Sequence, residues 1–308
     1  MTLSVSMVKE LREKSGAGMM DCKKALLETG GKIEEAIDWL RKQGLSAVAK
    51  KSSRVAAEGL IGVTVKDNQG ALIEINSETD FVARNELFQD FVKTCSDLSL
   101  TCNEDIEVLK QMQYPNTGRS VDQELSNNIA TIGENMNVRR TKILKVANGV
   151  ITSYVHNSVA DGLGKLGVLV ALESNGDKDK LSSVGKQIAM HIAATSPKSL
   201  DIEDLDKDVV NRERQVLIDQ AVASGKPKEI AEKMVNGRML KYFQEVVLNE
   251  QVSVIDGETK IKDVVTKLQK DLDTEVKLAG FVFLKLGEGI EISENDFAAE
   301  VAATAGIK

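Results

Sequence analysis

The chain has 308 residues, of which 42% are hydrophobic and 28% charged, and its formal net charge is −7 at pH 7. This composition is typical of folded globular proteins and excludes collagen-like, low-complexity and wholly disordered chains, while the negative charge argues against a general nucleic-acid-binding protein. Because no run of about 18 apolar residues and no signal peptide is found, we expect a cytoplasmic protein that does not bind membranes.

Residues 1–55 predict a small domain of three helices. Apolar residues recur at helical spacing in three segments, and glycines, the last of them Gly44, predict the helix ends. Met19, Cys22 and Leu26 form the expected apolar stripe of the second helix, and residues 50–54 are interpreted as a linker. This region holds eleven lysines and arginines against seven acidic residues, a net charge of +4, which leaves −11 for the rest. The asymmetry suits an acidic partner, although solvated helix faces explain most such cases.

Residues 56–145 begin with a pattern of period two that predicts a β-hairpin. Its strands are Leu60–Val65 and Ala71–Ile75. Thr79 or Asp80 is then expected to cap a helix. The apolar residues of that helix are Phe81, Val82, Leu87, Phe88, Phe91 and Val92.

Residues 146–208, completed by residues 249–290, repeat this order of elements. The expected strands are Val150–Val155, Gly167–Leu172 and Leu278–Lys285, with a helix before the last of them. We interpret the two halves as related α/β core subdomains with antiparallel sheets.

Residues 209–248 predict an antiparallel helical hairpin that protrudes from this core. Its turn is Ser224–Lys228, and such an arm is often an interaction or dimerisation device, so a homodimer is possible. The candidate seam residues are Val216, Ile230, Met234, Met239 and Phe243. A C-terminal helical module is expected over residues 291–308, which makes the fold α+β.

Covalent chemistry has little support in the sequence. The two histidines are His191, expected to pack inside a helix, and His156, expected at an exposed strand end. The three cysteines show no metal spacing and predict ordinary reduced thiols. Residues 162–167 match G-x-G-x-x-G, but a strand follows where a dinucleotide site needs a helix. We therefore expect no enzyme, no cofactor and no metal site.

Apolar residues in unusual places remain. Met19 and Met20 follow a glycine turn, and Phe81 follows acidic residues. From pattern alone, core methionines and a helix-staple phenylalanine are the more common explanation.

Five ordered motifs resemble the elongation factor Ts family. They are Val8–Leu26, Thr79–Asn85, Ile132–Arg140, Ser224–Met234 and Asp296–Val301. The resemblance runs nearly the full chain and implies that residues 1–55 form a ubiquitin-associated-like three-helix domain with its linker.

The resemblance also implies a function without covalent chemistry. Members of the family are guanine-nucleotide exchange factors that bind elongation factor Tu, GDP-bound or nucleotide-free, and promote GDP release during translation. In the family, the segment matching Thr79, Asp80, Phe81 and Val82 intrudes beside the partner's switch region and disturbs its Mg²⁺ site. Carried over, Asp80 and Phe81 form the wedge. The implied partner-binding residues are Arg12, Met19, Met20, Lys23, His156, Asp296 and Phe297.

Two other functions compete with this one. A ubiquitin-associated-type adaptor would use Met19 and Met20 to bind some other protein. A dinucleotide-binding enzyme would use residues 162–167, but the order of elements around those glycines disfavours it.

Overall fold

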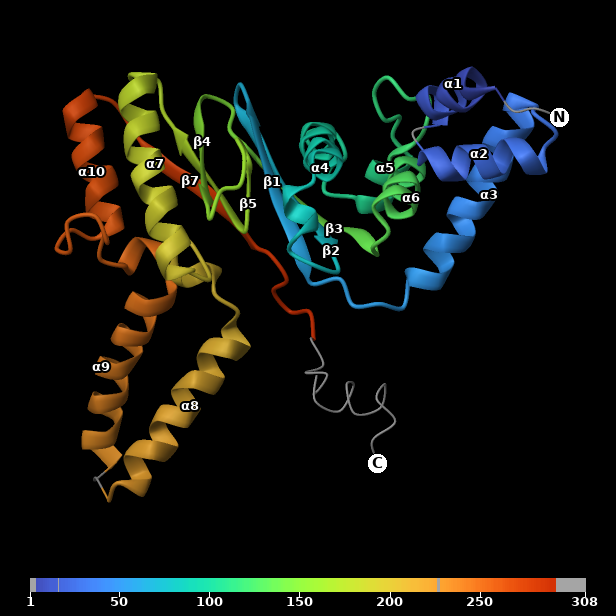
Figure 1. Cartoon of the computed structure of the whole chain (residues 1–308). Coiled ribbons are helices and arrows are strands. Elements are labelled where there is room, and N and C mark those ends of the chain that lie inside the picture. The colour runs from blue at the N-terminus through green and yellow to red at the C-terminus, as the bar shows by residue number, and fades with distance from the viewer. Residues whose placement is uncertain (1–3, 16, 226–227, 292–308) are drawn as a thin grey trace.

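The structure is a computed structural model that describes residues 4–15, 17–225 and 228–291 (Figure 1). The predicted C-terminal helical module, with Asp296 and Phe297, lies outside the described residues except for Glu291. The described residues form antiparallel sheets and helices, which confirms the α+β class.

Three helices form the N-terminal unit, as predicted: α1 (Val5–Ser15), α2 (Met19–Glu28) and α3 (Ile33–Lys51). They share a small core around Leu11, Cys22 and Leu26. The predicted helix end at Gly44 is wrong, because α3 continues through it to Lys51. A glycine inside a helix costs only about 1 kcal/mol, and here α3 packs on α6, where a Cβ on Gly44 would lie 3.7 Å from the Ala130 Cβ.

The first sheet has the strand order β3-β2-β1-β5. Its strands are β1 (Glu58–Lys66), β2 (Gln69–Ser77), β3 (Met136–Lys145) and β5 (Leu163–Gly164). One face is covered by α4 (Glu86–Ser99), α5 (Ile106–Gln111) and α6 (Val121–Ile132). The predicted hairpin is confirmed, with Lys66 paired to Gln69 around a two-residue turn. Gly62 lets α4 approach β1, since a Cβ there would lie 2.2 Å from the Ser96 Oγ.

The second sheet has the order β4-β6-β7. Its strands are β4 (Gly149–His156), β6 (Leu166–Glu173) and β7 (Lys277–Lys285), and its outer face is covered by α7 (Lys178–Thr195) and α10 (Ile261–Leu272). The two sheets pack face to face around Ile61, Leu72 and Leu169. The core therefore has four layers, with helices outside two sheets (Figure 1).

The two sheets share details that we take as support for related halves. β1 and β4 each begin near a glycine with positive φ, Gly59 and Gly149, whose added Cβ would strike a carbonyl oxygen of the paired strand. The pairing of β2 with β3 shifts between Glu74 and Ile75, and that of β6 with β7 shifts between Ala171 and Leu172. In these two details strands β1, β2 and β3 match strands β4, β6 and β7 in turn.

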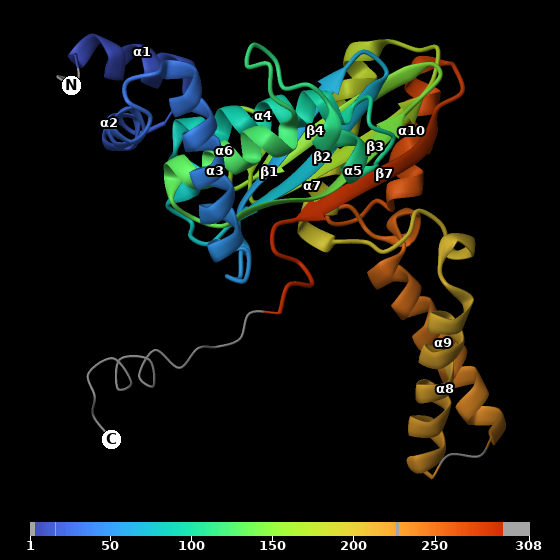
Figure 2. The same ribbon diagram turned by 90° about the vertical axis from the view of Figure 1, so that its right-hand side faces the viewer.

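A long helical hairpin projects from the second half, at the opposite end of the molecule from the N-terminal helices (Figures 1 and 2). It consists of α8 (Lys207–Ala223) and α9 (Lys228–Val246), which confirms the predicted helix pair. The seam was predicted only in part. Met239 is buried and Phe243 packs against it, but Val216 and Ile230 are exposed. The seam instead contains three other buried residues, Ala221, Ala231 and Val235. The two helices pack against each other through the faces that carry these side chains.

Three short 3₁₀ turns complete the described structure: η1 (Val82–Arg84), η2 (Ile202–Asp204) and η3 (Leu248–Glu250). In the part of the chain that the structure describes, no helix combines the length and apolar character that a bilayer-spanning segment requires.

Candidate functional site

The junction between β2 and α4 carries the segment Thr79–Val82. The predicted cap at Thr79 or Asp80 is wrong, because α4 begins later, at Glu86. Asn85 is the actual cap, and its Oδ1 accepts hydrogen bonds from the backbone N–H groups of Leu87 and Phe88 at 2.9 and 3.4 Å. The extended backbone of Asn85 separates α4 from the turn η1, so the chain changes direction between them.

Neighbouring side chains of this junction point in opposite directions. Val82 and Ala83 are buried in the core beneath α4, with Val82 only 4% exposed. Phe81 is 78% exposed, so the staple explanation from pattern alone is wrong. The Phe81 carbonyl accepts a hydrogen bond from the Arg84 N–H at 3.1 Å, and the Asp80 carbonyl accepts one from the Ala83 N–H at 3.2 Å. The exposed ring therefore stands on a closed turn whose next residues are anchored in the core.

Two glutamates hold this junction against the turn before β3. The Glu134 carboxylate accepts hydrogen bonds from the Thr79 N–H and Oγ1, at 2.9 and 2.7 Å. The Glu78 carboxylate accepts one from the Asn135 N–H at 2.5 Å. Each glutamate thus binds the backbone N–H of the residue that follows the other. We call Glu78, Thr79, Glu134 and Asn135 the glutamate clasp.

The glutamate clasp continues the sheet beyond its last backbone pair. The ladder between β2 and β3 ends with Ser77 opposite Met136. Past that point side-chain carboxylates replace carbonyl groups as acceptors, and hydrogen bonds to charged acceptors are stronger than those between neutral groups. Gly133, with φ of 93°, ends α6 and lets the chain turn into the clasp.

Arg54 connects the N-terminal unit to the glutamate clasp. Its guanidinium lies 3.4 Å from the Glu78 carboxylate, and its carbonyl accepts a hydrogen bond from the Asn135 Nδ2 at 2.7 Å. The residue expected to lie in a plain linker therefore makes a specific contact. No sequence pattern pointed to it, because its two partners lie far away in the chain.

The exposed tip of the junction carries charge. Asp80 and Arg84 flank Phe81 at the surface. Within the described residues, the Asp80 carboxylate makes no hydrogen bond or ion pair. An aromatic ring beside an unpaired charge is the kind of group that another protein surface can bind.

The predicted N-terminal site residues lie together on α1 and α2. Met19 is 60% exposed and Met20 74% exposed, so the alternative of core methionines is wrong, as is the placing of Met19 in the apolar stripe. Arg12 and Lys23 are also exposed. Gly18 precedes α2 without a side-chain cap. The unit rests on the core through α3 and through the Ser15 carbonyl, which accepts a hydrogen bond from Arg119 at 3.4 Å.

His156 lies on a different sheet from the junction. It is exposed at the end of β4, as predicted, and its Nδ1 lies 3.1 Å from the Tyr154 hydroxyl. The loop that follows crosses to the first sheet, where β5 pairs with β1. The structure thus brings Thr79, Asp80, Phe81 and Val82 together at one place and leaves His156 on the other half.

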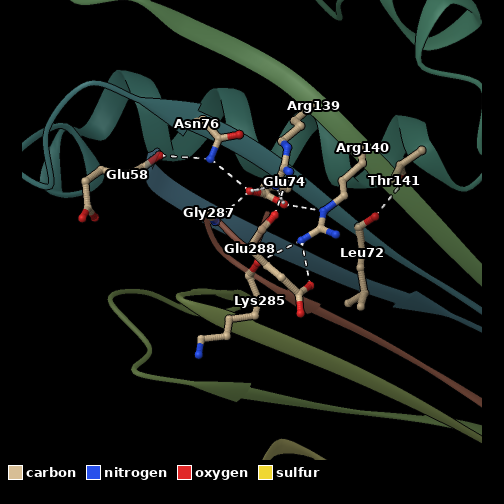
Figure 3. Close-up of polar contacts among 10 residues, drawn as sticks. All are labelled: Glu58, Leu72, Glu74, Asn76, Arg139, Arg140, Thr141, Lys285, Gly287 and Glu288. Atoms are coloured by element: carbon tan, nitrogen blue, oxygen red, sulfur yellow. Dashed lines mark hydrogen bonds and ion pairs between the residues drawn. The ribbon is translucent and has the colours of Figure 1, made fainter. Parts of the chain in front are cut away.

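A buried carboxylate that the sequence did not reveal connects the two sheets (Figure 3). Glu74 of β2 has no exposed surface, and it accepts hydrogen bonds from Arg139 at 2.9 Å, Arg140 at 2.5 Å and the Gly287 N–H at 2.8 Å. Burial alone would raise the pKa of Glu74, but hydrogen bonds from Asn76, Gly287 and Arg140 outweigh it, and the pKa lies below its ordinary value. The sequence held one sign of this carboxylate, an acidic residue within the apolar run of β2.

Arg139 and Arg140 extend this network to the segment after β7. They donate to the carbonyls of Glu288 and Lys285, at 2.7 and 2.9 Å. The chain leaving the second sheet is therefore tied to the first sheet beside β3, the strand that follows the glutamate clasp.

Comparison with known proteins identifies the family. A family model described as Elongation factor TS matches residues 78–288, more than half of the chain. The chain belongs to the elongation factor Ts family. Relatives named elongation factor Ts include those of Rhodospirillum centenum, 60% identical over 304 residues that cover 99% of each chain, and Rhodospirillum rubrum, 56% identical over 302 residues that cover 98% of each. The relative from Paramagnetospirillum magneticum is 56% identical over 99% of this chain and 98% of its own.

In this member of the elongation factor Ts family, the matched region begins at the glutamate clasp. Two of the motifs that carry the resemblance, Thr79–Asn85 and Ile132–Arg140, meet there. The motifs are far apart in sequence, and the fold brings them into contact at this junction.

The groups that could support covalent chemistry are buried or dispersed in this elongation factor Ts family member. His191 is packed as predicted; its Nδ1 accepts from the Val254 N–H at 3.2 Å, its Nε2 lies 2.9 Å from the Gln251 Oε1, and burial lowers its pKa. The three cysteines are buried and unpaired, and burial raises the pKa of Cys95. Across the described ranges, no three acidic, histidine or cysteine side chains gather as metal ligands.

Proposed function

We propose that this protein is a guanine-nucleotide exchange factor of elongation factor Tu, acting in the cytoplasm. Membership of the elongation factor Ts family supports the class of function. The observation that carries the mechanism is the exposure of Phe81 on a junction whose adjacent residues are held by the core and by the glutamate clasp.

Exchange needs differential binding and no covalent step. A protein that binds nucleotide-free elongation factor Tu more tightly than the GDP-bound form must weaken GDP binding by the same factor, because the coupling between two ligands is reciprocal. A ligand with equal affinity for the two forms would shift nothing. The proposed task of this chain is therefore to favour the form that has lost GDP.

Phe81 and Asp80 are the proposed wedge. Inserted beside the switch region of elongation factor Tu, the ring would displace groups that support the Mg²⁺ ion, and the carboxylate would compete for hydrogen bonds there. An aromatic ring suits this task because it has few rotatable bonds and a large apolar surface. Loss of Mg²⁺ would weaken the partner's hold on the GDP phosphates.

Other exposed residues are the proposed docking points. Arg12, Met19, Met20 and Lys23 would bind the nucleotide-binding domain, and His156 would lie near the phosphate side of the interface. Asp296 and Phe297 are assigned to docking by the resemblance alone. Binding energy gained at these points would offset the strain that the wedge imposes on the partner.

The decisive experiment measures the release of fluorescent GDP from elongation factor Tu with and without this protein. We expect faster release that saturates with protein concentration. An unchanged release rate at saturating protein would overturn the proposal.

A second measurement addresses the Mg²⁺ step. If the wedge acts by displacing Mg²⁺, a high Mg²⁺ concentration should slow the accelerated release, because the ion then competes with the wedge by mass action. An acceleration that does not change with Mg²⁺ would leave exchange in place but contradict the wedge mechanism.

A ubiquitin-associated-type adaptor remains the second candidate, favoured by the exposure of Met19 and Met20. Such an adaptor would bind its partner through α2 and would not depend on Phe81. Deletion of residues 1–55 separates the two candidates, because an adaptor should then lose all partner binding, whereas an exchange factor should still bind elongation factor Tu through its core.

A further inference from the structure

We propose that Glu134 is a positioning residue that fixes the direction of Phe81 through the glutamate clasp. This inference rests on the proposed function, since direction matters only if Phe81 must push on a partner. Glu134 lies outside the Thr79–Val82 segment, in the turn between α6 and β3.

The first step of the argument is where the constraint acts. Glu134 accepts both donors of Thr79, the backbone N–H at 2.9 Å and the Oγ1 at 2.7 Å. Two bonds from one residue to one carboxylate fix the peptide plane as well as the position of that residue. Thr79 lies only two residues before Phe81, so little backbone freedom remains between the fixed point and the ring.

The second step is that the opposite side of Phe81 is also fixed. Val82 and Ala83 are buried, and the Ala83 carbonyl accepts a hydrogen bond from the Gln89 side chain of α4 at 2.8 Å. Phe81 thus lies between a buried anchor and the glutamate clasp. Loss of the Glu134 carboxylate would remove both donors of Thr79 from their acceptor and leave only its carbonyl held, by a hydrogen bond from the Ser77 Oγ at 3.0 Å. The exposed tip would then yield more easily when pressed.

The third step is that this contact is not required to complete the sheet. β2 and β3 already pair along their length up to Ser77 and Met136. The Glu134 side chain is partly exposed, unlike the buried Glu74 that holds the two sheets together. Loss of the Glu134 carboxylate should therefore loosen the junction while the fold persists.

The chain offers a matched control in Glu104. Its carboxylate accepts a hydrogen bond from the Ile143 N–H at 2.7 Å and pairs with Lys142 at 2.8 Å. Like Glu134, it is a carboxylate from a loop that binds the backbone of a second segment. It contacts the other end of β3, away from Phe81.

The experiment compares Glu134→Ala, Glu134→Gln and Glu104→Ala in full-length protein. We expect Glu134→Ala to lower the maximal rate of GDP release roughly tenfold, because a misplacement of about 1 Å can cost up to about a hundredfold. Glu134→Gln keeps one acceptor oxygen, so its maximal rate should lie between those of Glu134→Ala and the wild type. The protein concentration that gives half the maximal rate should change less than about threefold, since the docking residues are untouched.

A readout independent of GDP release is amide hydrogen exchange in the free protein at Thr79, whose N–H donates to Glu134, and at Ala83, whose N–H closes the turn beneath Phe81. Glu134→Ala should speed it locally, with thermal unfolding close to wild type, and Glu104→Ala should leave it unchanged. A maximal rate within twofold of wild type in a Glu134→Ala protein with a loosened junction would overturn the proposal. So would an equal loss of rate in Glu104→Ala. If the wild type itself fails to accelerate GDP release, the proposed function falls and this inference with it.

Discussion

The junction at Phe81 and the helix start at Met19 and Met20 both expose apolar side chains, yet they are built differently. Phe81 lies two residues after Thr79, which donates two hydrogen bonds to Glu134, and it directly precedes two buried residues. Met19 and Met20 begin a helix whose preceding residue provides no side-chain cap. One segment presents a stiff ring on a fixed backbone, and the other presents flexible thioether chains.

We propose that this difference separates two tasks in binding elongation factor Tu. A group that must displace part of a partner has to keep its position under load, which demands a supported backbone. A group that only holds the partner gains from adaptable side chains, and methionine has three rotatable bonds and a polarisable sulfur. We therefore assign perturbation to Phe81 and docking to the methionines.

The largest expected effect comes from Phe81→Ala. The maximal rate of GDP release should fall by roughly 30-fold or more, since the loss of a central aromatic anchor costs about 2 kcal/mol or more. Thermal unfolding should not change, because the ring is exposed in the free protein. Stopped-flow release of fluorescent GDP and calorimetry would measure the two quantities. Unimpaired release in this variant would remove Phe81 from the mechanism.

Val82→Ala tests whether the residue after Phe81 anchors the junction in the core. The resemblance groups Val82 with the wedge, but its side chain is buried under α4. Truncation should lower the free energy of unfolding by about 2 kcal/mol, from lost apolar burial and a small cavity. Denaturant titration measures this loss. Stability equal to wild type would show that Val82 does not anchor the junction.

Replacement of both Met19 and Met20 by alanine should weaken binding to elongation factor Tu without slowing GDP release from the bound complex. We expect the protein concentration for half-maximal release to rise roughly tenfold, which corresponds to about 1.4 kcal/mol of affinity. The maximal rate should stay near wild type. A titration of GDP release against protein concentration yields both values, and a lower maximal rate would contradict the division between docking and perturbation.

Asn85→Ala gives the smallest expected effect. Removal of the cap of α4 should destabilise the fold by about 1 kcal/mol, because two N–H groups of the first helical turn lose their acceptor. Exchange should change less than in Phe81→Ala, since the glutamate clasp remains. Thermal unfolding of Asn85→Ala beside Asn85→Asp, which keeps an acceptor oxygen, would measure the cap alone.

The sequence by itself determined the order and type of most elements. Runs of strand-forming residues predicted β1, β2, β4, β6 and β7, and helical spacing with turn residues predicted the N-terminal helices and the hairpin arm. The strand predictions succeeded because strands buried on both faces, such as β2 and β6, carry runs of consecutive apolar residues. The helix predictions succeeded because helical periodicity reflects which face of a helix is buried. The motifs, through the family resemblance, also located the segment that holds Phe81.

Only the tertiary structure decided which of those residues are free to bind a partner. Phe81 and Val82 are neighbours with similar apolar character, and nothing local distinguishes the exposed one from the buried one. Gly44 looked like a helix end because its packing partner, Ala130, lies far along the chain. Contacts between distant segments, such as Glu134 with Thr79 and Glu74 with Gly287, leave no periodic trace, since the fold alone brings them together.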